Sequence, residues 1–323
     1  MILVTGALGR IGSAATRALH ARGAAVKALV PSRDHVPALA QLGIPLAEGD
    51  YDDGHRLSGA LEDVETLILI SRPSADLVAV QERVIDACAT AGVRRIVKLS
   101  ACGAGPDGAS DAARWHWRIE QHLRRTPVES CIVRPARLMQ EILHQVPLLL
   151  TSGMLVGCQG DGRLADVDAR DVGGVLAAYA VAERLPEAPV LATGPVALDH
   201  AALCALLTTA FGRPVRYVDC APIDFEMTLL AAGLSPWQVH DLVMTASNAA
   251  QGAHDRVTDI VETSTGRAPR GFGQFAQELA TALRYAHAPE GATIASPQER
   301  HAAHRRKAVT RGQTPTCFST RSR

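Results

Sequence analysis

Three glycines stand three residues apart near the start of the chain, in the stretch MILVTGALGRIG. They follow a short apolar run and precede a segment of helical character, SAATRALHARG. Glycines at a strand-to-helix turn let the backbone approach a diphosphate closely, and the start of the helix offers unpaired N–H groups. The pattern predicts a dinucleotide-binding turn, with a purely structural turn as the alternative. Contacts are expected from Gly6, Leu8, Gly9, Arg10, Ile11 and Gly12.

The first half of the chain alternates short apolar runs with longer helical segments. The runs lie at 2–6, 24–30, 44–50, 66–71, 95–101 and 129–135. The stretches between them, including the one at 34–42, are long enough for crossover helices, which implies parallel strands buried on both faces. We therefore expect an α/β fold, a Rossmann-type doubly wound parallel sheet with a smaller, mostly helical C-terminal lobe.

Beyond Pro135 the rhythm changes. The sequence predicts an apolar helix to about Thr151, a hairpin-like polar stretch at 157–171, strands at 189–194 and 215–220, and mostly helices at 222–286. Asp168 and Asp171 are expected to be structural, as helix caps or between strands. Three regions follow: an NAD(P)-binding Rossmann domain at 1–150, a smaller substrate-binding lobe at 151–286, and a basic tail at 287–323 that we expect to be disordered.

The overall composition argues against several classes of partner. The 323 residues carry 33 basic and 33 acidic side chains, which gives no global field to attract nucleic acid or an anionic membrane. Apolar runs such as 175–182 are much shorter than the ~20 residues of a membrane span, and the opening strand lacks signal-peptide features. The seven scattered cysteines have no metal-ligand spacing. We expect reduced thiols, no metal site and a cytoplasmic location.

The stretch VTGALGRIG resembles the VTGATGxxG signature of short-chain dehydrogenases/reductases. The stretches at 48–71, 95–104, 132–143 and 166–178 resemble, in order, segments of the NmrA-like, atypical branch of that superfamily, and the similarity continues to about residue 285. That branch includes quinone and triphenylmethane reductases. The resemblance implies an NAD(P)H-dependent reductase that acts on a small, apolar quinone, carbonyl or conjugated acceptor. Whether the protein forms a homodimer is left open.

The residues after the second strand bear on the choice of cofactor. An acidic side chain there favours NAD, whereas a basic one accommodates the 2′-phosphate of NADP. Family members that prefer NADPH commonly place arginine directly after the strand, where this chain has Pro31. Ser32 and Arg33 would therefore make the phosphate contact two positions late, unless Arg33 is an ordinary solvated charge. We expect NADP(H) to be favoured over NAD(H).

Further cofactor contacts follow from topology, because the carboxyl ends of parallel strands open on one crevice. Asp50 and Tyr51 are expected beside the adenine, although Tyr51 could equally pack in the core. Ser71 and Arg72 are expected along the ribose and diphosphate. The remaining contacts are expected from Lys98, Ser100 and Pro135, of which the first two lie on the nicotinamide side.

Short-chain reductases usually carry a tyrosine and a lysine one helical turn apart, and none of the four tyrosines here has a lysine four residues later. Matching Glu120 to the corresponding helix of related enzymes puts His116 at the lysine position. His116 either acts in the pocket or is a helix-surface histidine paired with Glu120. Ser100 falls within one residue of the usual catalytic serine, but a strand-end structural role is as plausible. Hydride transfer itself needs no protein acid, because solvent can supply the proton.

Substrate contacts are expected after RPAR, from Met139, Gln140 and Leu143, and from the region of Trp237. Met139 and Leu143, four residues apart, could instead belong to the core. The rival interpretation is a non-catalytic NAD(P) redox sensor that acts through a protein partner, and a weaker one is isomerisation or dehydration at the same cofactor site. The substrate-side segment and the second lobe favour the enzyme.

Overall fold

The computed structural model describes residues 1–32, 39, 41–49, 51 and 53–286. Arg33, Asp50, most of the segment at 34–42 and the tail at 287–323 lie outside the described residues. The chain divides into two compact units, Met1–Leu279 and Ala280–Arg323, and the sheets, clusters and sites below belong to the first. None of the described helices is both long and apolar enough to cross a membrane.

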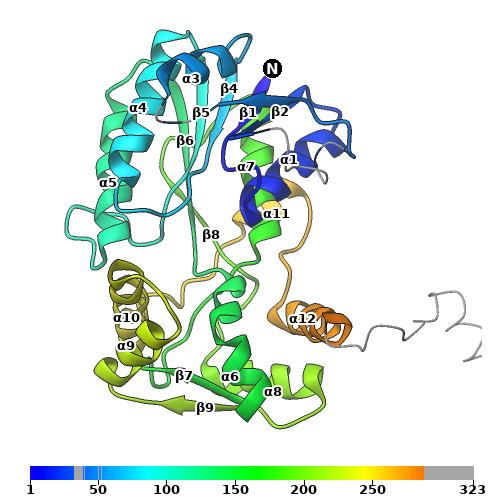
Figure 1. Ribbon diagram of the computed structural model, residues 1–323, viewed down its shortest axis with the longest axis vertical. Coiled ribbons are helices and arrows are strands. Elements are labelled where there is room, and N and C mark those ends of the chain that lie inside the picture. Colours follow the sequence, from blue (N-terminus) through cyan, green and yellow to red (C-terminus); the bar gives the residue numbers. More distant parts are fainter. Residues whose placement is uncertain (33–38, 40, 50, 52, 287–323) are drawn as a thin grey trace, which may run out of the picture. The chain divides into compact units, whose positions relative to one another are not determined.

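The larger sheet has seven strands in the order β3-β2-β1-β4-β5-β6-β8, and every pair of neighbours is parallel (Figure 1). Its strands are β1 Ile2–Val4, β2 Val26–Val30, β3 Leu46–Glu48, β4 Thr66–Leu69, β5 Arg95–Leu99, β6 Glu129–Pro135 and β8 Val190–Ala192. The direction of strand succession reverses between β1 and β4, where their carboxyl ends open a crevice. The expected doubly wound sheet is confirmed. Strand β8 comes from beyond residue 150, and the domain boundary there stays a prediction.

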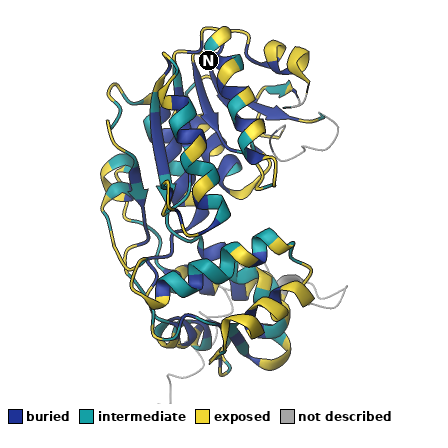
Figure 2. Cartoon of the chain, turned by 90° about the vertical axis from the view of Figure 1, so that its left-hand side faces the viewer, coloured by how far each residue is buried: buried dark blue, intermediate teal, exposed yellow. Residues whose placement is uncertain are grey.

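Strand side chains alternate between two buried faces of this sheet. Ile2 and Val4 belong to a cluster with α1 and α7, whereas Leu3 belongs to a cluster with α3, α4 and α5. Most residues of β1, β2, β4 and β5 are buried, and the middle of the sheet is dark blue in Figure 2, because both of its faces are covered. The covering helices are α1 Arg10–Ala21, α3 Gly54–Ala60, α4 Leu77–Thr90, α5 Asp111–Arg124 and α7 Ala169–Val181.

The smaller lobe contains a second sheet, in which β7 (Met154–Gly157) pairs in parallel with β9 (Arg216–Asp219). The strands expected at 189–194 and 215–220 are confirmed as β8 and β9, whereas β7 was not predicted and the hairpin expected at 157–171 is not formed. The expected helices at 222–286 are present. The remaining elements are η2 Met139–Gln145, α6 Val146–Ser152, α8 His200–Phe211, α9 Pro222–Ala231, α10 Pro236–Ala250, α11 Ile260–Thr265 and α12 Phe272–Ala286.

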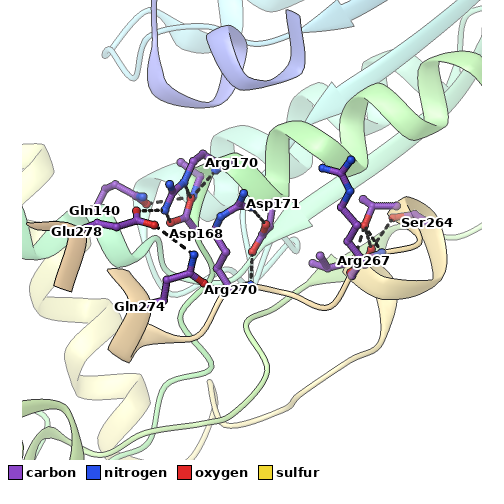
Figure 3. Close-up of polar contacts among 12 residues, drawn as sticks. Gln140, Asp168, Arg170, Asp171, Ser264, Arg267, Arg270, Gln274 and Glu278 are labelled. Atoms are coloured by element: carbon purple, nitrogen blue, oxygen red, sulfur yellow. Dashed lines mark hydrogen bonds and ion pairs between the residues drawn. The ribbon is translucent and has the colours of Figure 1, made fainter. Parts of the chain in front are cut away.

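Two carboxylates at the start of α7 tie this helix to later parts of the chain (Figure 3). Asp168 caps the helix by accepting a hydrogen bond from the backbone N–H of Arg170 at 2.7 Å, and Arg170 also pairs with Glu278 at 2.6 Å. Asp171 accepts from the backbone N–H of Arg270 at 2.7 Å and contacts its guanidinium group. The structural roles expected for both aspartates are confirmed.

Replacing Asp171 with alanine is expected to lower the free energy of unfolding by about 2 kcal/mol, because the Arg270 guanidinium and N–H would lose a buried partner. Asp171 is 6% exposed. Urea denaturation measures the loss. Asp86→Ala is the matched control, since the Asp86 side chain is 63% exposed and contacts only the surface residue His122 among the ion pairs found; it should cost less than about 1 kcal/mol. Equal losses for the two variants would contradict the prediction.

Candidate functional site

The glycine turn at the end of β1 is braced by neighbouring strand ends. The hydroxyl of Thr5 accepts from the N–H of Ile70 at 2.8 Å and donates to its carbonyl at 2.7 Å, which ties β1 to β4. Gly6 has φ +58°, a conformation that favours glycine, and its N–H donates to the Tyr51 hydroxyl at 3.2 Å. The Tyr51 hydroxyl thus contacts the turn, and its ring packs against the core cluster that contains Leu3, as the alternative for this residue had it. Its contact with the adenine stays a prediction.

Close backbone contact explains Gly12, the third glycine. A Cβ atom at Gly12 would lie 2.1 Å from the carbonyl oxygen of Gly6, and one at Gly9 would lie 3.3 Å from the same oxygen. The turn is therefore folded onto the first turn of α1. Leu8, Gly9 and Arg10 are exposed at its tip, so this surface is open to a ligand.

The N-terminus of α1 suits an anionic group. Gly9 is its N-cap residue and has no side chain to accept from the first amides, so within the described residues no side-chain cap is found. The first N–H groups of a helix lack partners inside the helix and carry its positive dipole end. The uncapped turn, with backbone space that any side chain would fill, fits the diphosphate of a dinucleotide.

The other expected cofactor residues are only partly brought together. Ser32 follows β2, and Ser71 and Arg72 follow β4, so all three lie at the carboxyl ends of the two strands that flank β1. The Ser71 hydroxyl accepts from the Gln81 side chain at 3.2 Å. Arg33 and Asp50 lie outside the described residues, so their cofactor contacts stay predictions.

Polar side chains cluster between β5, β6 and α5. Glu120 is completely buried; it accepts a 2.6 Å hydrogen bond from the Ser100 hydroxyl and two from the Arg134 guanidinium, at 2.9 and 2.6 Å. Because the Ser100 hydroxyl donates its only proton to Glu120, its oxygen can only accept further hydrogen bonds. Arg134 was missed by the sequence analysis, which had matched only Glu120 to related enzymes.

His116 lies one helical turn before Glu120 but does not pair with it. Its Nδ1 atom is 2.9 Å from the Nζ atom of Lys98, and the ring lines a pocket at the carboxyl edge of the sheet. Burial, together with the charges of Lys98 and Arg134, holds the pKa of His116 well below its usual value. The imidazole is therefore neutral at physiological pH. Lys98 itself is fully buried behind His116 and exposes no surface to the crevice.

This pocket has a volume of about 370 Å³ and lies between the strand ends of the larger sheet and helix α10. Aromatic side chains from two helices meet in it: the rings of Trp115 on α5 and Trp237 on α10 are 5.7 Å apart. Ser100, Pro135 and His116 also line it. Its walls combine flat apolar surfaces with a few polar atoms, which is typical of a small-molecule site.

The segment after RPAR lines the pocket through a different set of residues from the expected one. Leu138, Glu141 and His144 face it, whereas Met139, Gln140 and Leu143 are absent from its wall. Residues 139–145 form a 3₁₀ helix, in which every third side chain shares a face, so the α-helical spacing assumed for this segment was wrong. Met139 is buried, and the Gln140 side chain accepts from the backbone N–H of Ala169 at 3.1 Å.

A thiol and an imidazole on the pocket wall were not predicted from the sequence. Cys102 follows the end of β5, and its Sγ atom lies 3.7 Å from Nδ1 of His254. Burial raises the pKa of the Cys102 thiol, which disfavours the thiolate. No group of three or more potential metal ligands gathers anywhere among the described residues.

Comparison with known proteins agrees with this geometry. A family described as NAD(P)H-binding matches residues 6–184. The NAD(P)H azoreductase of Xenophilus azovorans is 29% identical over 88% of this chain and 99% of its own length. The (4-alkanoyl-5-oxo-2,5-dihydrofuran-3-yl)methyl phosphate reductase of Streptomyces griseus is 32% identical over the same shares, 88% and 99%.

Among solved structures, the NADPH-dependent quinone oxidoreductase QOR2 of Escherichia coli, complexed with NADPH, superimposes with a TM-score of 0.80 at 25% identity. The superposition covers 86% of this chain and 99% of that one. The matched regions include the glycine turn, the parallel sheet and the smaller lobe. The protein belongs to the NAD(P)H-binding, NmrA-like branch of the atypical short-chain dehydrogenases/reductases.

Proposed function

We propose that this protein is an NADPH-dependent reductase that transfers a hydride to a small, apolar quinone or another conjugated acceptor. One observation carries the proposal: the uncapped glycine turn and the aromatic pocket both lie at the carboxyl ends of strands in one parallel sheet. Bound along this edge, the reduced nicotinamide would supply the hydride. Ser71, Arg72 and Pro135 lie along the same edge and are proposed as further contacts.

The pocket favours a flat acceptor. Trp115 and Trp237 offer ring faces against which an aromatic or quinonoid substrate can stack, with centroids 5.7 Å apart. The azo and quinone compounds named for its relatives are conjugated acceptors of this kind. Leu138, the N-cap residue of η2, adds an apolar wall.

His116 is the group proposed to protonate the reduced acceptor. Its neutral ring lines the pocket, whereas the proton of the Ser100 hydroxyl is already donated to Glu120 at 2.6 Å. Ser100 is therefore assigned to orient Glu120 and to accept a hydrogen bond. In this proposal the imidazole of His116, held in place by α5, takes over the proton donation that a tyrosine and a lysine provide in other short-chain reductases.

Mixing the protein with NADPH and a panel of benzoquinones, naphthoquinones and enones tests the function, with loss of the reduced nicotinamide absorbance as the readout. Multiple turnovers with at least one conjugated acceptor are expected. Tight binding of NADPH without turnover of any acceptor would instead favour a redox sensor. Absence of binding to either nicotinamide cofactor would remove the basis of both functions.

Arg33→Ala is expected to raise the KM for NADPH about tenfold and to leave the KM for NADH within about twofold, because one charge-assisted contact to the 2′-phosphate would be lost. Steady-state kinetics with the two cofactors measure the difference. The NADPH-bound relative supports this choice of cofactor. Arg22→Ala, at the C-cap of α1 and away from the strand end, is the control. Equal effects on both cofactors would contradict the preference for NADPH.

A further inference from the structure

Lys98 is completely buried, yet its ammonium group has a specific polar environment. Its Nζ atom donates to the carbonyl oxygen of Leu99 at 2.9 Å and lies 2.9 Å from Nδ1 of His116. Strand alternation explains its position, since Ile96 on the same face of β5 packs against α5. Burying an ammonium group is unfavourable unless hydrogen bonds and opposite charges compensate for the lost hydration. A lysine at this buried position therefore needs an explanation.

We propose that Lys98 is a positioning residue that fixes the proton of His116 on Nε2, facing the pocket, and resupplies it through Nδ1 when His116 protonates the reduced substrate. The proposal rests on the proposed function for its final step. Its first part, control of the imidazole tautomer, does not depend on turnover.

The tautomer follows from donor and acceptor chemistry. An ammonium group can only donate, so a protonated Lys98 requires Nδ1 of His116 to accept. A neutral imidazole then carries its proton on Nε2, for which the described residues provide no hydrogen-bond partner. When Lys98 is deprotonated, its amine has a lone pair as well as N–H bonds, so it can accept from Nδ1 and the Nδ1–H form of His116 becomes accessible. We propose that His116 takes this form, so that the charge of Lys98 controls whether the pocket meets a donor or an acceptor.

The proton balance closes without another acid. Hydride addition leaves the acceptor oxygen negative, and the two electrons come from oxidation of the nicotinamide. The Nε2–H bond of His116 breaks as its proton bonds to that oxygen, and Nδ1 takes a proton from Nζ of Lys98. The imidazole is neutral before and after, while Lys98 changes from ammonium to amine. A solvent proton entering at Nε2 restores both groups after the product leaves.

The surrounding charges keep Lys98 able to exchange a proton. The pKa of Lys98 is lowered to about 7, chiefly by burial, with the charge of Glu120 acting to raise it and that of Arg134 to lower it. These two groups and His116 are the titratable or charged side chains that face Lys98 from α5 and β6. A group with a pKa near the working pH both gives up and regains a proton readily. Activity that depends on His116 as a donor should fall as the pH rises through this pKa.

The decisive experiment follows the His116 tautomer by nuclear magnetic resonance of protein labelled with ¹⁵N-histidine, with the signal assigned by a His116→Gln variant. In the wild type, the proton should move from Nε2 to Nδ1 as the pH is raised through neutrality. In Lys98→Met, which removes a buried charge, the move should be absent. Lys98→Arg, with a group that stays charged, should hold the Nε2–H form throughout. Lys27→Met, at a partly exposed lysine on β2, is the matched control.

Kinetics supply the second readout. Lys98→Met should lower kcat for quinone reduction about 10- to 100-fold and abolish the decline of activity at high pH, with NADPH affinity changed less than about twofold. Persistence of the tautomer change in Lys98→Met, or full turnover with an unchanged pH profile, would overturn the proposal. If the wild type reduces no acceptor, the proposed function fails, and the tautomer measurement alone still decides whether Lys98 controls His116.

Discussion

Exchange of Gly12 for alanine is expected to abolish NADPH binding and to lower the free energy of unfolding by about 3 kcal/mol. The added Cβ atom would lie 2.1 Å from the carbonyl oxygen of Gly6, a backbone atom that cannot move aside as a side chain can. Either the turn or the first turn of α1 must shift, and both carry the amides offered to the diphosphate. Calorimetric titration with NADPH and urea denaturation measure the two effects.

Gly9→Ala separates cofactor binding from folding, in case the first variant does not fold. A Cβ atom at Gly9 would lie 3.3 Å from the Gly6 oxygen, a contact that a small shift relieves. It would also occupy the exposed surface where the diphosphate is expected, so the dissociation constant for NADPH should rise about 10- to 100-fold. Its melting temperature should stay close to that of the wild type.

Gly59→Ala is the control, because it makes the same substitution in α3, where a Cβ atom meets nothing within 4 Å. Alanine there should be neutral or slightly stabilising, since it restricts the unfolded chain. Unchanged NADPH affinity in both Gly9→Ala and Gly12→Ala would refute a diphosphate site at this turn.

The sheet could be predicted because six of its seven strands coincide with continuous apolar runs in the first half of the sequence. Buried parallel strands need apolar side chains on both faces, and the six predicted runs at 2–6 to 129–135 became β1 to β6. Strand β7 was not predicted because its apolar run is very short. Its four residues alternate between partly buried and buried positions in a two-stranded sheet, so tertiary pairing with β9 rather than local pattern decides its conformation.

The substrate-facing residues could have been found from a proline. Pro147 has no N–H to donate to the carbonyl of Leu143, so an α-helix could not run unbroken from Met139 to Thr151. The structure has a 3₁₀ helix ending at Gln145, where the N–H of Val146 donates to Leu143, and α6 begins anew. Three-residue spacing then selects a different face from the four-residue spacing assumed.

The role of Lys98 could be read only in part from the sequence. Alternation along RIVKLS places Lys98 and Ser100 on the same side of β5 as Ile96, which predicts the face but not the helix that covers it. Only the packing of α5 shows that His116 and Glu120 meet these two side chains. A site assembled from separate elements depends on helix rotation, which local sequence determines weakly.

Glu120→Ala is expected to lower the free energy of unfolding by about 3–5 kcal/mol, the other large effect predicted for this chain. The carboxylate is fully buried and satisfies the Ser100 hydroxyl and the Arg134 guanidinium at 2.6 to 2.9 Å. Its loss would leave Arg134, whose side chain is 21% exposed, and the buried Lys98 without a compensating negative charge. Urea denaturation at neutral pH measures the change.

The loss should also depend on pH, because Glu120 raises the pKa of Lys98. Without Glu120, burial and Arg134 lower that pKa further, so more of the folded protein holds Lys98 as the amine at neutral pH. A lysine whose pKa is lower in the folded than in the unfolded protein reduces stability at every pH below its pKa in the unfolded protein. This penalty grows as the pH falls towards the pKa in the folded protein. The part of the destabilisation that comes from Lys98 should therefore be largest in mildly acidic solution and shrink as the pH is raised to about 7, above which Lys98 is mostly the amine in both folded proteins.

Glu129→Ala is the matched control. Glu129 lies on β6, the strand that also carries Arg134. Glu129 pairs with Arg95 at 2.9 Å, but its side chain is 50% exposed, so water can replace the lost partner. This variant should cost less than about 1 kcal/mol and show no such pH dependence. A loss for Glu120→Ala as small as that for Glu129→Ala would mean that the buried cluster is not held together by its carboxylate, and that water reaches Lys98 and Arg134 in the folded protein.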